Sequence, residues 1–326
     1  MAIDWPISPR RLRELGVLGM NQRNGEFISE MNQRRYYPLV DDKLLTKELA
    51  EEAGLNVPTL YGVIRSTHEI KHLARWVGEH EDFVIKPANG AGGDGILVID
   101  GKQSDKPLIY RKSSGQAVGI DTIALHLSNI LAGAYSLGGR PDVAMIEYRV
   151  KFSPLFERIS FQGVPDIRTI VYRGYPLMAM VRLPTTQSDG KANLHQGAIG
   201  AGVDMAAGQT LDGVAHNRRV THHPDTRQPI SGVAVPGWQA LLEMAARCHD
   251  MTGLGYLGVD VVLDRELGPL ILELNARPGL SIQVANGEGL RHRVERVDRH
   301  LRYLDDREAS AQRAVWSREN LAPMIL

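Results

Sequence analysis

A cluster of glycines after a lysine is the first feature of this sequence that could do chemistry. Residues 84–96 read VIKPANGAGGDGI, and the four clustered glycines are Gly90, Gly92, Gly93 and Gly95. Glycines leave backbone N–H groups uncovered, so such a loop can wrap phosphate oxygens. Lys86 adds a full positive charge at the edge of the loop. The segment predicts a phosphate-binding loop, and the alternative interpretation is an ordinary surface turn.

Other glycine-rich nucleotide loops do not match this segment. Gly90-x-Gly92-x-x-Gly95 fits the dinucleotide fingerprint in form, but that fingerprint needs a helix after the glycines, whereas ILVI at 96–99 predicts a strand. The HRD and DFG motifs of protein kinases are absent, and Gly101-Lys102-Gln103 does not complete a Walker loop. A phosphate clamp between two strands remains.

Oxygen donors gather about 170 residues later. Asp260 lies in GVDVVL, while Glu273 and Asn275 lie in LILELNARPG. Glu273 and Asn275 are two residues apart on a predicted strand, so their side chains point to one face. If Asp260 lies opposite Glu273 in a hairpin, two carboxylates and an amide oxygen converge, and this donor set suits Mg²⁺. The alternative is a structural network in which the two acids bind basic side chains.

The elements around the glycine loop follow from periodicity and end signals. A helix is predicted from Asp41 or Asp42 to Ala53, and the capping-box pattern Ser66–Glu69 predicts a second helix to about Glu79. The remaining elements predicted in this region are strands at 61–64, 82–86 and 96–99, an exposed hairpin or loop at 102–120, and a helix at 121–135.

The second half of the chain is richer in strands. Strands are predicted at 143–150, 166–172, 176–183, 259–263 and 270–275, a loop at 214–232, and helices at 238–251 and 288–304, while 190–213 is a glycine-rich stretch with little periodicity. Strands and helices mix without a regular βαβ alternation, so the sequence predicts an α+β fold.

Composition narrows the class of protein. Lys plus Arg and Asp plus Glu both number 38, which argues against a general nucleic-acid binder. The single cysteine, Cys248, excludes an internal disulfide framework. No apolar run approaches the roughly 20 residues of a membrane helix, and the N-terminus lacks the apolar core of a signal peptide. We expect a soluble, cytoplasmic protein.

Taken in order, the motifs resemble the ATP-grasp superfamily. The glycine loop and GVDVVL…LILELNARPGL carry the resemblance, and the intermediate motifs at 146–148, 166–168 and 193–197 are similar to the RimK-like branch, the α-L-glutamate ligases. The resemblance covers about residues 38–287 and implies two α+β lobes clasping Mg-ATP. It divides the chain into a docking segment (1–40), lobes at about 41–142 and 143–287, and a C-terminal helical segment (288–326).

The resemblance also implies roles for particular residues. The residues implied to hold ATP are Lys43 and Lys86 at the phosphates, Glu147, Tyr148, Arg149 and Val150 at the adenine, Val84 and Leu272 over the ring, and Asn193 and His195 on a closing loop. Asp260, Glu273 and Asn275 fall on the magnesium positions, and Arg168 faces the reacting phosphate and carboxylate. Glu157 is a candidate for the ribose hydroxyls on spacing alone.

Two features bear on the substrates. Arg277 follows the magnesium positions and could bind a substrate carboxylate in bidentate fashion, with an ion pair to a neighbouring acid as the alternative. Only 42 residues precede Lys43, too few for the family's pre-grasp domain. One hypothesis is that a second subunit, or a protein or peptide substrate, supplies that wall, with residues 1–40 and the stripe Val294/Val297/Leu301/Leu304 as candidate contacts. We favour the interpretation that both pack on their own chain.

The function implied by the resemblance is ATP-dependent carboxylate–amine ligation through an acyl phosphate. The enzyme would add an amino acid, with glutamate inherited from the family label, to a peptide, protein or small-molecule acceptor. The alternatives are an ATP-grasp small-molecule kinase and a catalytically idle ATP-binding regulatory protein. Neither nucleic acid nor membrane insertion is expected.

Overall fold

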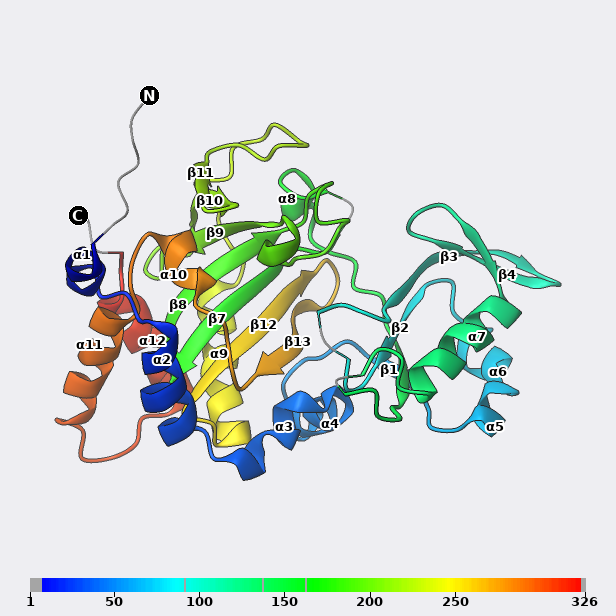
Figure 1. The fold of residues 1–326 in the computed structure, drawn as a ribbon, viewed down its shortest axis with the longest axis horizontal. Coiled ribbons are helices and arrows are strands. Elements are labelled where there is room, and N and C mark those ends of the chain that lie inside the picture. The colour runs from blue at the N-terminus through cyan, green and yellow to red at the C-terminus, as the bar shows by residue number, and fades with distance from the viewer. Residues whose placement is uncertain (1–7, 91, 137, 162, 324–326) are drawn as a thin grey trace. The chain divides into compact units, whose positions relative to one another are not determined.

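The computed structural model describes residues 8–90, 92–136, 138–161 and 163–323, except for the side chain of Glu157 (Figure 1). The chain divides into two compact units. Residues 41–151 form the first unit, and the described residues before Asp41 and after Lys151 form the second. Each unit contains one large sheet whose neighbouring strands are antiparallel. The predicted α+β class is confirmed.

The unit of residues 41–151 is built on a six-stranded sheet in the order β1-β6-β2-β3-β4-β5. Its elements are α4 (Lys43–Glu52), β1 (Leu60–Ile64), α5 (Thr67–Ile70), α6 (Leu73–Val77), β2 (Phe83–Pro87), β3 (Leu97–Asp105), β4 (Leu108–Lys112), β5 (Ala117–Gly119), α7 (Ile120–Leu131) and β6 (Ala144–Glu147).

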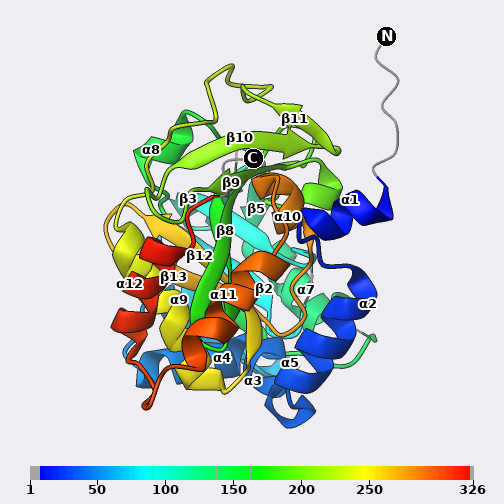
Figure 2. The same ribbon diagram turned by 90° about the vertical axis from the view of Figure 1, so that its left-hand side faces the viewer.

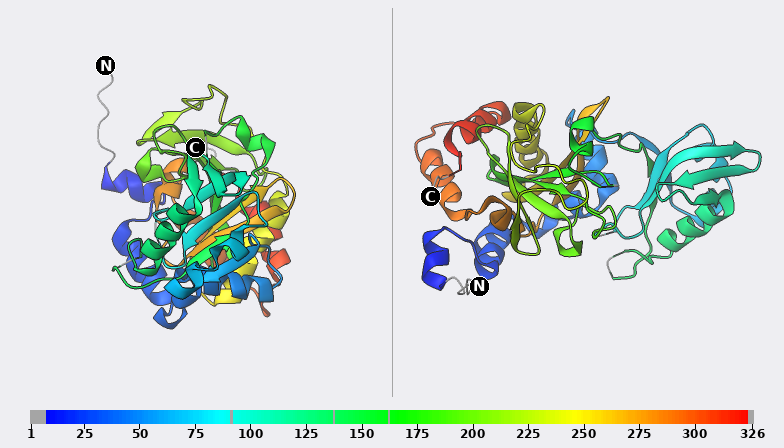
Figure 3. Two further views of the ribbon diagram at one scale, coloured as in Figure 1. Left: turned by 90° about the vertical axis from the view of Figure 1, so that its right-hand side faces the viewer. Right: turned by 90° about the horizontal axis from the view of Figure 1, so that it is seen from above.

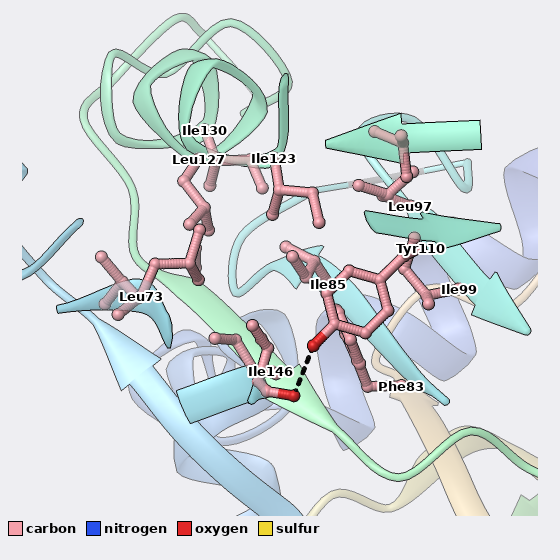
Figure 4. Packing of buried hydrophobic residues seen from close by; sticks show 14 residues of the cluster. Leu73, Phe83, Ile85, Leu97, Ile99, Tyr110, Ile123, Leu127, Ile130 and Ile146 are labelled. Atoms are coloured by element: carbon pink, nitrogen blue, oxygen red, sulfur yellow. Dashed lines mark hydrogen bonds between the residues drawn. The ribbon is translucent and has the colours of Figure 1, made fainter. Parts of the chain in front are cut away.

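The two faces of this sheet have different coverings. On one face, α7 buries Ile123, Leu127 and Ile130 against Ile85, Tyr110 and their neighbours, as Figure 4 shows. On the other face, Leu44 of α4 packs with Ala88 and Met145. Because side chains alternate along a strand, Ile85 belongs to the α7 core while Lys86 points to the α4 face. The site residues of this unit lie on the α4 face.

Helix prediction was right for α4 and wrong for residues 66–79. Asp42 caps α4 by accepting hydrogen bonds from the backbone N–H groups of Leu44 and Leu45. At Ser66 there is no side-chain cap, because Glu69 instead accepts a hydrogen bond from the backbone N–H of Arg65. The expected single helix is therefore two short ones, α5 and α6. The predicted hairpin or loop at 102–120 is paired strand for much of its length.

The second unit is built on a seven-stranded sheet in the order β11-β10-β9-β8-β7-β12-β13. Its strands are β7 (Asp166–Tyr172), β8 (Tyr175–Leu183), β9 (Ile199–Val203), β10 (Thr210–Ala215), β11 (Arg218–Val220), β12 (Tyr256–Asp264) and β13 (Gly268–Asn275). Its helices are α1 (Pro9–Glu14), α2 (Met20–Gln22), the π-helix η1 (Arg23–Ser29), the 3-10 helices η2 (Arg34–Tyr36) and η3 (Leu194–Gln196), α3 (Pro38–Asp41, at the boundary), α8 (Pro154–Glu157), α9 (Trp238–Thr252), α10 (Ser281–Asn286), α11 (Arg291–Leu301) and α12 (Ser310–Asn320).

Helices cover both faces of this second sheet. Figures 2 and 3 show α9 and α12 on one side and α1, α2 and α10 on the other. Strand β9 and most of β10 lie in the glycine-rich stretch 190–213, where the sequence has little periodicity. Strand β11 lies in 214–232, where a loop is predicted, and that prediction is wrong there because β11 pairs with β10. The helix predicted at 288–304 is α11, and Val294 and Val297 of its stripe are buried within the unit.

The described part of the N-terminal segment, residues 8–40, packs on its own chain. Phe27 contacts the rings of Tyr172 and Tyr256, with centroids 5.7 and 5.3 Å away. The amide of Asn32 donates hydrogen bonds to the carbonyls of Tyr256 (2.6 Å) and Ala276 (2.8 Å). This segment therefore completes the unit of the seven-stranded sheet. Within the described residues, no helix has both the length and the apolar character needed to span a bilayer.

Candidate functional site

The glycine loop of the first unit has the backbone that its sequence predicts. Gly92, Gly93 and Gly95 have φ values of +67°, +83° and +76°, a region that favours glycine. Close packing also restricts Gly95, since a Cβ there would lie 2.5 Å from the ring of Tyr135. Ala91 lies outside the described residues. The glycines are thus required by the conformation of the loop.

Two further groups hold this loop. The amino group of Lys43 donates to the carbonyl of Gly90 at 2.5 Å, and the backbone N–H of Lys43 donates to the carbonyl of Ala88 at 3.0 Å. The buried carboxylate of Asp142 accepts hydrogen bonds from the backbone and side chain of Asn89 and from the hydroxyl of Ser136. Lys43 therefore lies beside Gly90 of the loop, and a contact between Lys43 and phosphate stays a prediction. No sequence pattern predicted a role for Asp142, because its partner Asn89 is 53 residues away and its partner Ser136 lies in a loop.

Lys86 lies in a buried charge cluster. Its amino group is 2.5 Å from Oε1 of Glu147, and the amino group of Lys47 is 3.0 Å from Oε2 of the same carboxylate. All three side chains are at most 8% exposed. Lys47 was missed, although its position four residues after Lys43 places both lysines on one face of α4. Lys47, Lys86 and Glu147 therefore form a buried, ion-paired cluster in this unit.

Burial and charge oppose each other in the pKa values of this cluster. Burial favours the neutral acid at Glu147, but the adjacent Lys86 and Lys47 outweigh it and hold the pKa below its ordinary value. Burial lowers the pKa of Lys47, and repulsion from Lys86 lowers it further against the attraction of Glu147. The two adjacent lysines thus favour the ionised form of the buried Glu147 carboxylate.

The residues predicted to contact adenine follow β6. The backbone of Glu147 is paired with both Leu60 of β1 and Val84 of β2, and its side chain forms the ion pairs described above. The backbone N–H of Tyr148 donates to the carbonyl of Thr59 at 2.8 Å, while Val150 is buried. Arg149 forms an ion pair with Asp82 at 3.3 Å. An adenine role for this segment stays a prediction.

In the second unit, the register of the β12–β13 hairpin places the oxygen donors together. Asp260 lies directly opposite Glu273, as in the predicted hairpin, and Asn275 is two residues further along β13. Arg168 of β7 lies opposite Asp260 on its other side. One row across three strands therefore carries Arg168, Asp260 and Glu273. Within the described chain, no three His, Cys, Asp or Glu side chains form a ready metal cluster, so the donor set depends on Asn275.

Two arginines engage the carboxylate of Asp260. Nε and Nη2 of Arg168 donate to its two oxygens at 2.7 and 2.5 Å, a bidentate contact, and Arg182 donates to it at 2.7 Å. Arg182 also binds Asp166 in bidentate fashion. Sequence reasoning missed Arg182, because only the β7–β8 register brings it to Asp166.

The two buried acids of this network have opposite pKa shifts. Burial and the negative charge of Asp260 raise the pKa of Asp166 to about 6, against the pull of Arg182. Burial alone would raise the pKa of Asp260 as well, but Arg168 and Arg182 together lower it. Asp260 is therefore held as a carboxylate next to Glu273. The contacts with Arg168 and Arg182 are the structural network of acids and basic side chains that was the alternative for Asp260. They still leave the carboxylate able to act as an oxygen ligand, since it has about four lone-pair sites.

The remaining predicted residues lie on loops or strand ends of this unit. Oδ1 of Asn193 accepts a hydrogen bond from the backbone N–H of the exposed His195, so Asn193 caps η3. Leu272 is half-buried on β13. Oδ1 of Asn275 accepts a hydrogen bond from the backbone N–H of Arg277 at 2.7 Å, which ties the following turn to the candidate metal position. Glu157 lies in α8, and its side chain falls outside the described part of the structure.

Comparison with known proteins assigns the family. Residues 22–299 match the sugar-transfer associated ATP-grasp family, and the chain belongs to it. The chain is 26% identical over 287 residues to a probable alpha-L-glutamate ligase of Parasynechococcus marenigrum (strain WH8102), covering 87% of this chain and 47% of the relative.

Two further proteins are similar. A probable alpha-L-glutamate ligase of Aeromonas salmonicida (strain A449) is 22% identical over 254 residues, covering 78% of this chain and 62% of the relative. The chain therefore spans about half to three fifths of the length of these curated relatives. Among solved structures, D-cycloserine synthetase DcsG is 15% identical with a TM-score of 0.47, over 82% of this chain and 73% of that one.

Proposed function

We propose that the chain is an ATP-dependent carboxylate–amine ligase that forms an amide bond through an acyl phosphate. Family membership and the names of the two curated relatives support this proposal. The observation that carries it is the hairpin register, which sets Asp260 against Glu273 with Asn275 on the same strand. Hydrogen bonds from Arg168 and Arg182 hold Asp260 in place.

The residues fit magnesium by the chemistry of their donors. Glu273, Asn275 and Asp260 offer only oxygen, the donor that Mg²⁺ prefers, and Mg²⁺ ordinarily keeps several waters and takes few protein ligands. Magnesium bound there would neutralise phosphate charge as a Lewis acid. In the other unit, Lys43 and Lys86 would hold phosphate oxygens beside the glycine loop.

The chemistry requires two anions to react. A carboxylate oxygen of the acid attacks the γ-phosphorus of ATP, and the bond to the β-phosphate oxygen breaks to release ADP. The amine then attacks the acyl carbon, loses a proton and expels phosphate. The protein positions the reactants and neutralises their charge, and no covalent nucleophile is needed. Arg168 would bind the incoming carboxylate and neutralise its charge. We propose an amino acid, with glutamate tested first, and a peptide, protein or small-molecule acceptor.

The test is ADP release from Mg-ATP with a panel of carboxylic acids, each with and without amines, followed by mass spectrometry of the products. We expect ADP formation that depends on the acid and an amide product that depends on the amine. A stable phosphorylated product that needs no amine would indicate a kinase. ATP binding without ADP release for any acid would indicate a regulatory protein, and either result would overturn the proposal.

Two substitutions test the residues. Glu273→Gln and Lys86→Ala should each lower turnover by roughly 10²–10³-fold, the usual effect of removing one charged contact to the transition state. The matched control is Glu266→Gln, an exposed acid in the β12–β13 turn, which should leave turnover unchanged. Circular dichroism checks the fold of each variant. Turnover at the wild-type rate in either variant would refute the role of that residue.

A further inference from the structure

Arg182 of β8 was not predicted as a site residue, yet it reaches a candidate magnesium ligand. In the register of the sheet it lies opposite Asp166 of β7, and Asp260 lies one strand further on, in β12, opposite Arg168. Neighbouring strands are about 4.8 Å apart, so the side chain of Arg182 extends across β7 to contact Asp260. The side chains of Arg182, Asp166 and Asp260 are 12%, 6% and 2% exposed.

Asp166 anchors the guanidinium of Arg182. Nε of Arg182 donates to Oδ1 of Asp166 at 2.5 Å and Nη2 donates to Oδ2, so the contact is bidentate. Nη2 carries a second N–H, which donates to Oδ2 of Asp260 at 2.7 Å. Within the described chain, the side chain of Asp166 forms hydrogen bonds with Arg182 and with no other residue. The pair therefore holds a guanidinium of fixed orientation beside Asp260.

The carboxylate of Asp260 accepts three hydrogen bonds from the two arginines. Arg168 donates to Oδ1 at 2.7 Å and to Oδ2 at 2.5 Å, and Arg182 donates to Oδ2 at 2.7 Å. A carboxylate has about four lone-pair sites, so roughly one is left for a further contact. In the proposed reaction Arg168 also meets the incoming carboxylate, whereas Arg182 is anchored to Asp166. Arg182 is therefore the donor that can hold Asp260 throughout.

We propose that Arg182 is a positioning residue for magnesium: anchored by Asp166, it holds the Asp260 carboxylate in the orientation that binds the ion. This proposal rests on the proposed function, which assigns magnesium to Asp260. Loss of a residue that hydrogen-bonds a metal ligand typically lowers metal affinity 10–100-fold. Simple electrostatics makes the opposite prediction, because a guanidinium repels a cation and its removal should tighten binding. The sign of the change therefore separates positioning from charge.

The test is titration of the full chain with Mn²⁺, without nucleotide, followed by the paramagnetic resonance signal of the free ion. Mn²⁺ takes the same kinds of oxygen ligand as Mg²⁺. We expect the wild type to bind Mn²⁺ with a Kd below about 1 mM, and Glu273→Gln to bind it at least tenfold more weakly. A weaker wild-type Kd, or a smaller effect of Glu273→Gln, would overturn the proposal because the ion would not bind at this site.

The decisive variant is the double substitution Asp166→Val/Arg182→Met. It removes one acid and one cation, so the net charge is unchanged, and replacing a buried ion pair by apolar side chains is often neutral for stability. We expect Mn²⁺ binding at least tenfold weaker than in the wild type. Arg182→Lys keeps the charge but loses the planar fork, so its affinity should lie between those of the double variant and the wild type.

A matched control removes another pair from the same sheet. Asp212→Val/Arg219→Met eliminates a cross-strand ion pair between β10 and β11 and should bind Mn²⁺ as the wild type does. Urea unfolding shows whether each variant is folded. A loss of less than tenfold or tighter binding in the double variant, or an equal loss in the control, would overturn the proposal. If the double variant does not fold, wild-type affinity in Arg182→Lys would overturn it.

The two proposals fail in different ways. Mn²⁺ binding that weakens in the double variant, with no ADP formed from Mg-ATP and any acid, would leave the positioning role of Arg182 and remove the ligase. Amide formation by the wild type, with unchanged Mn²⁺ affinity in Asp166→Val/Arg182→Met, would leave the ligase and remove the positioning role.

Discussion

The buried cluster of Glu147 with Lys47 and Lys86 makes a sharp prediction about stability. Glu147→Gln keeps the shape of the side chain and removes its charge, which leaves two lysines with side chains only 5% and 8% exposed. At the 2.5 and 3.0 Å separations of the ion pairs, an effective dielectric of about 20 gives roughly 5–7 kcal/mol of attraction for each contact. Desolvation of each ion costs several kcal/mol, so we expect a net loss of about 3–5 kcal/mol in the free energy of unfolding.

The pH dependence of that loss follows from the signs of the pKa shifts. Glu147 has a lowered pKa in the folded protein, so its carboxylate stabilises the fold fully at a pH above its ordinary pKa of 4.5. This stabilisation is lost as the pH falls through the lowered pKa of the folded state. Lys47 has a lowered pKa, so its burial is costly while it is charged, and the cost declines as the pH rises toward 10.5. The difference between wild type and Glu147→Gln should therefore be largest near neutral pH and smaller at pH 4 and pH 10.

The assay is urea unfolding followed by tryptophan fluorescence at each pH. Trp76 packs against the core of the same unit and reports its unfolding. The control is Glu48→Gln, which removes an exposed acid on α4, the helix that carries Lys47. This variant should change the free energy of unfolding by less than about 0.5 kcal/mol. A Glu147→Gln variant within 1 kcal/mol of wild type at pH 7, or a loss that grows toward pH 10, would refute the reasoning.

Two other predictions concern a buried amide and the glycine loop. Asn32→Ala leaves the backbone N–H of Tyr256 and two buried carbonyls without their partners, so we expect a loss of about 2–4 kcal/mol in thermal or urea unfolding, and a loss below 1 kcal/mol would contradict it. Gly95→Ala forces a Cβ against Tyr135, whereas Gly92→Ala adds a Cβ in open space at a similar φ. Fluorescent ATP-analogue titration should show a larger loss of affinity for Gly95→Ala, and equal affinities would show that the packing of Gly95 does not matter.

Local sequence determined several elements because their signals lie within a few residues. Asp42 and the periodic leucines predict α4, and the apolar run that ends at Lys86 predicts the strand at 82–86. The strand 270–275 put Glu273 and Asn275 on one face without any tertiary information. Where a competing local contact existed, as between Glu69 and Arg65, the same reasoning failed for the helix at 66–79.

Partners distant in the sequence were decided only by the tertiary structure. Pairing of β12 with both β7 and β13 places Arg168 and Glu273 on either side of Asp260, and no local pattern contains that register. The contacts of Arg182 with Asp166 and Asp260, and of Asp142 with Asn89, join residues 16 to 78 positions apart. One pocket of the second unit is lined both by residues between Arg23 and Tyr37 and by Arg277. Periodicity specifies which way a side chain points, whereas the packing of whole strands and helices decides which other side chain it meets.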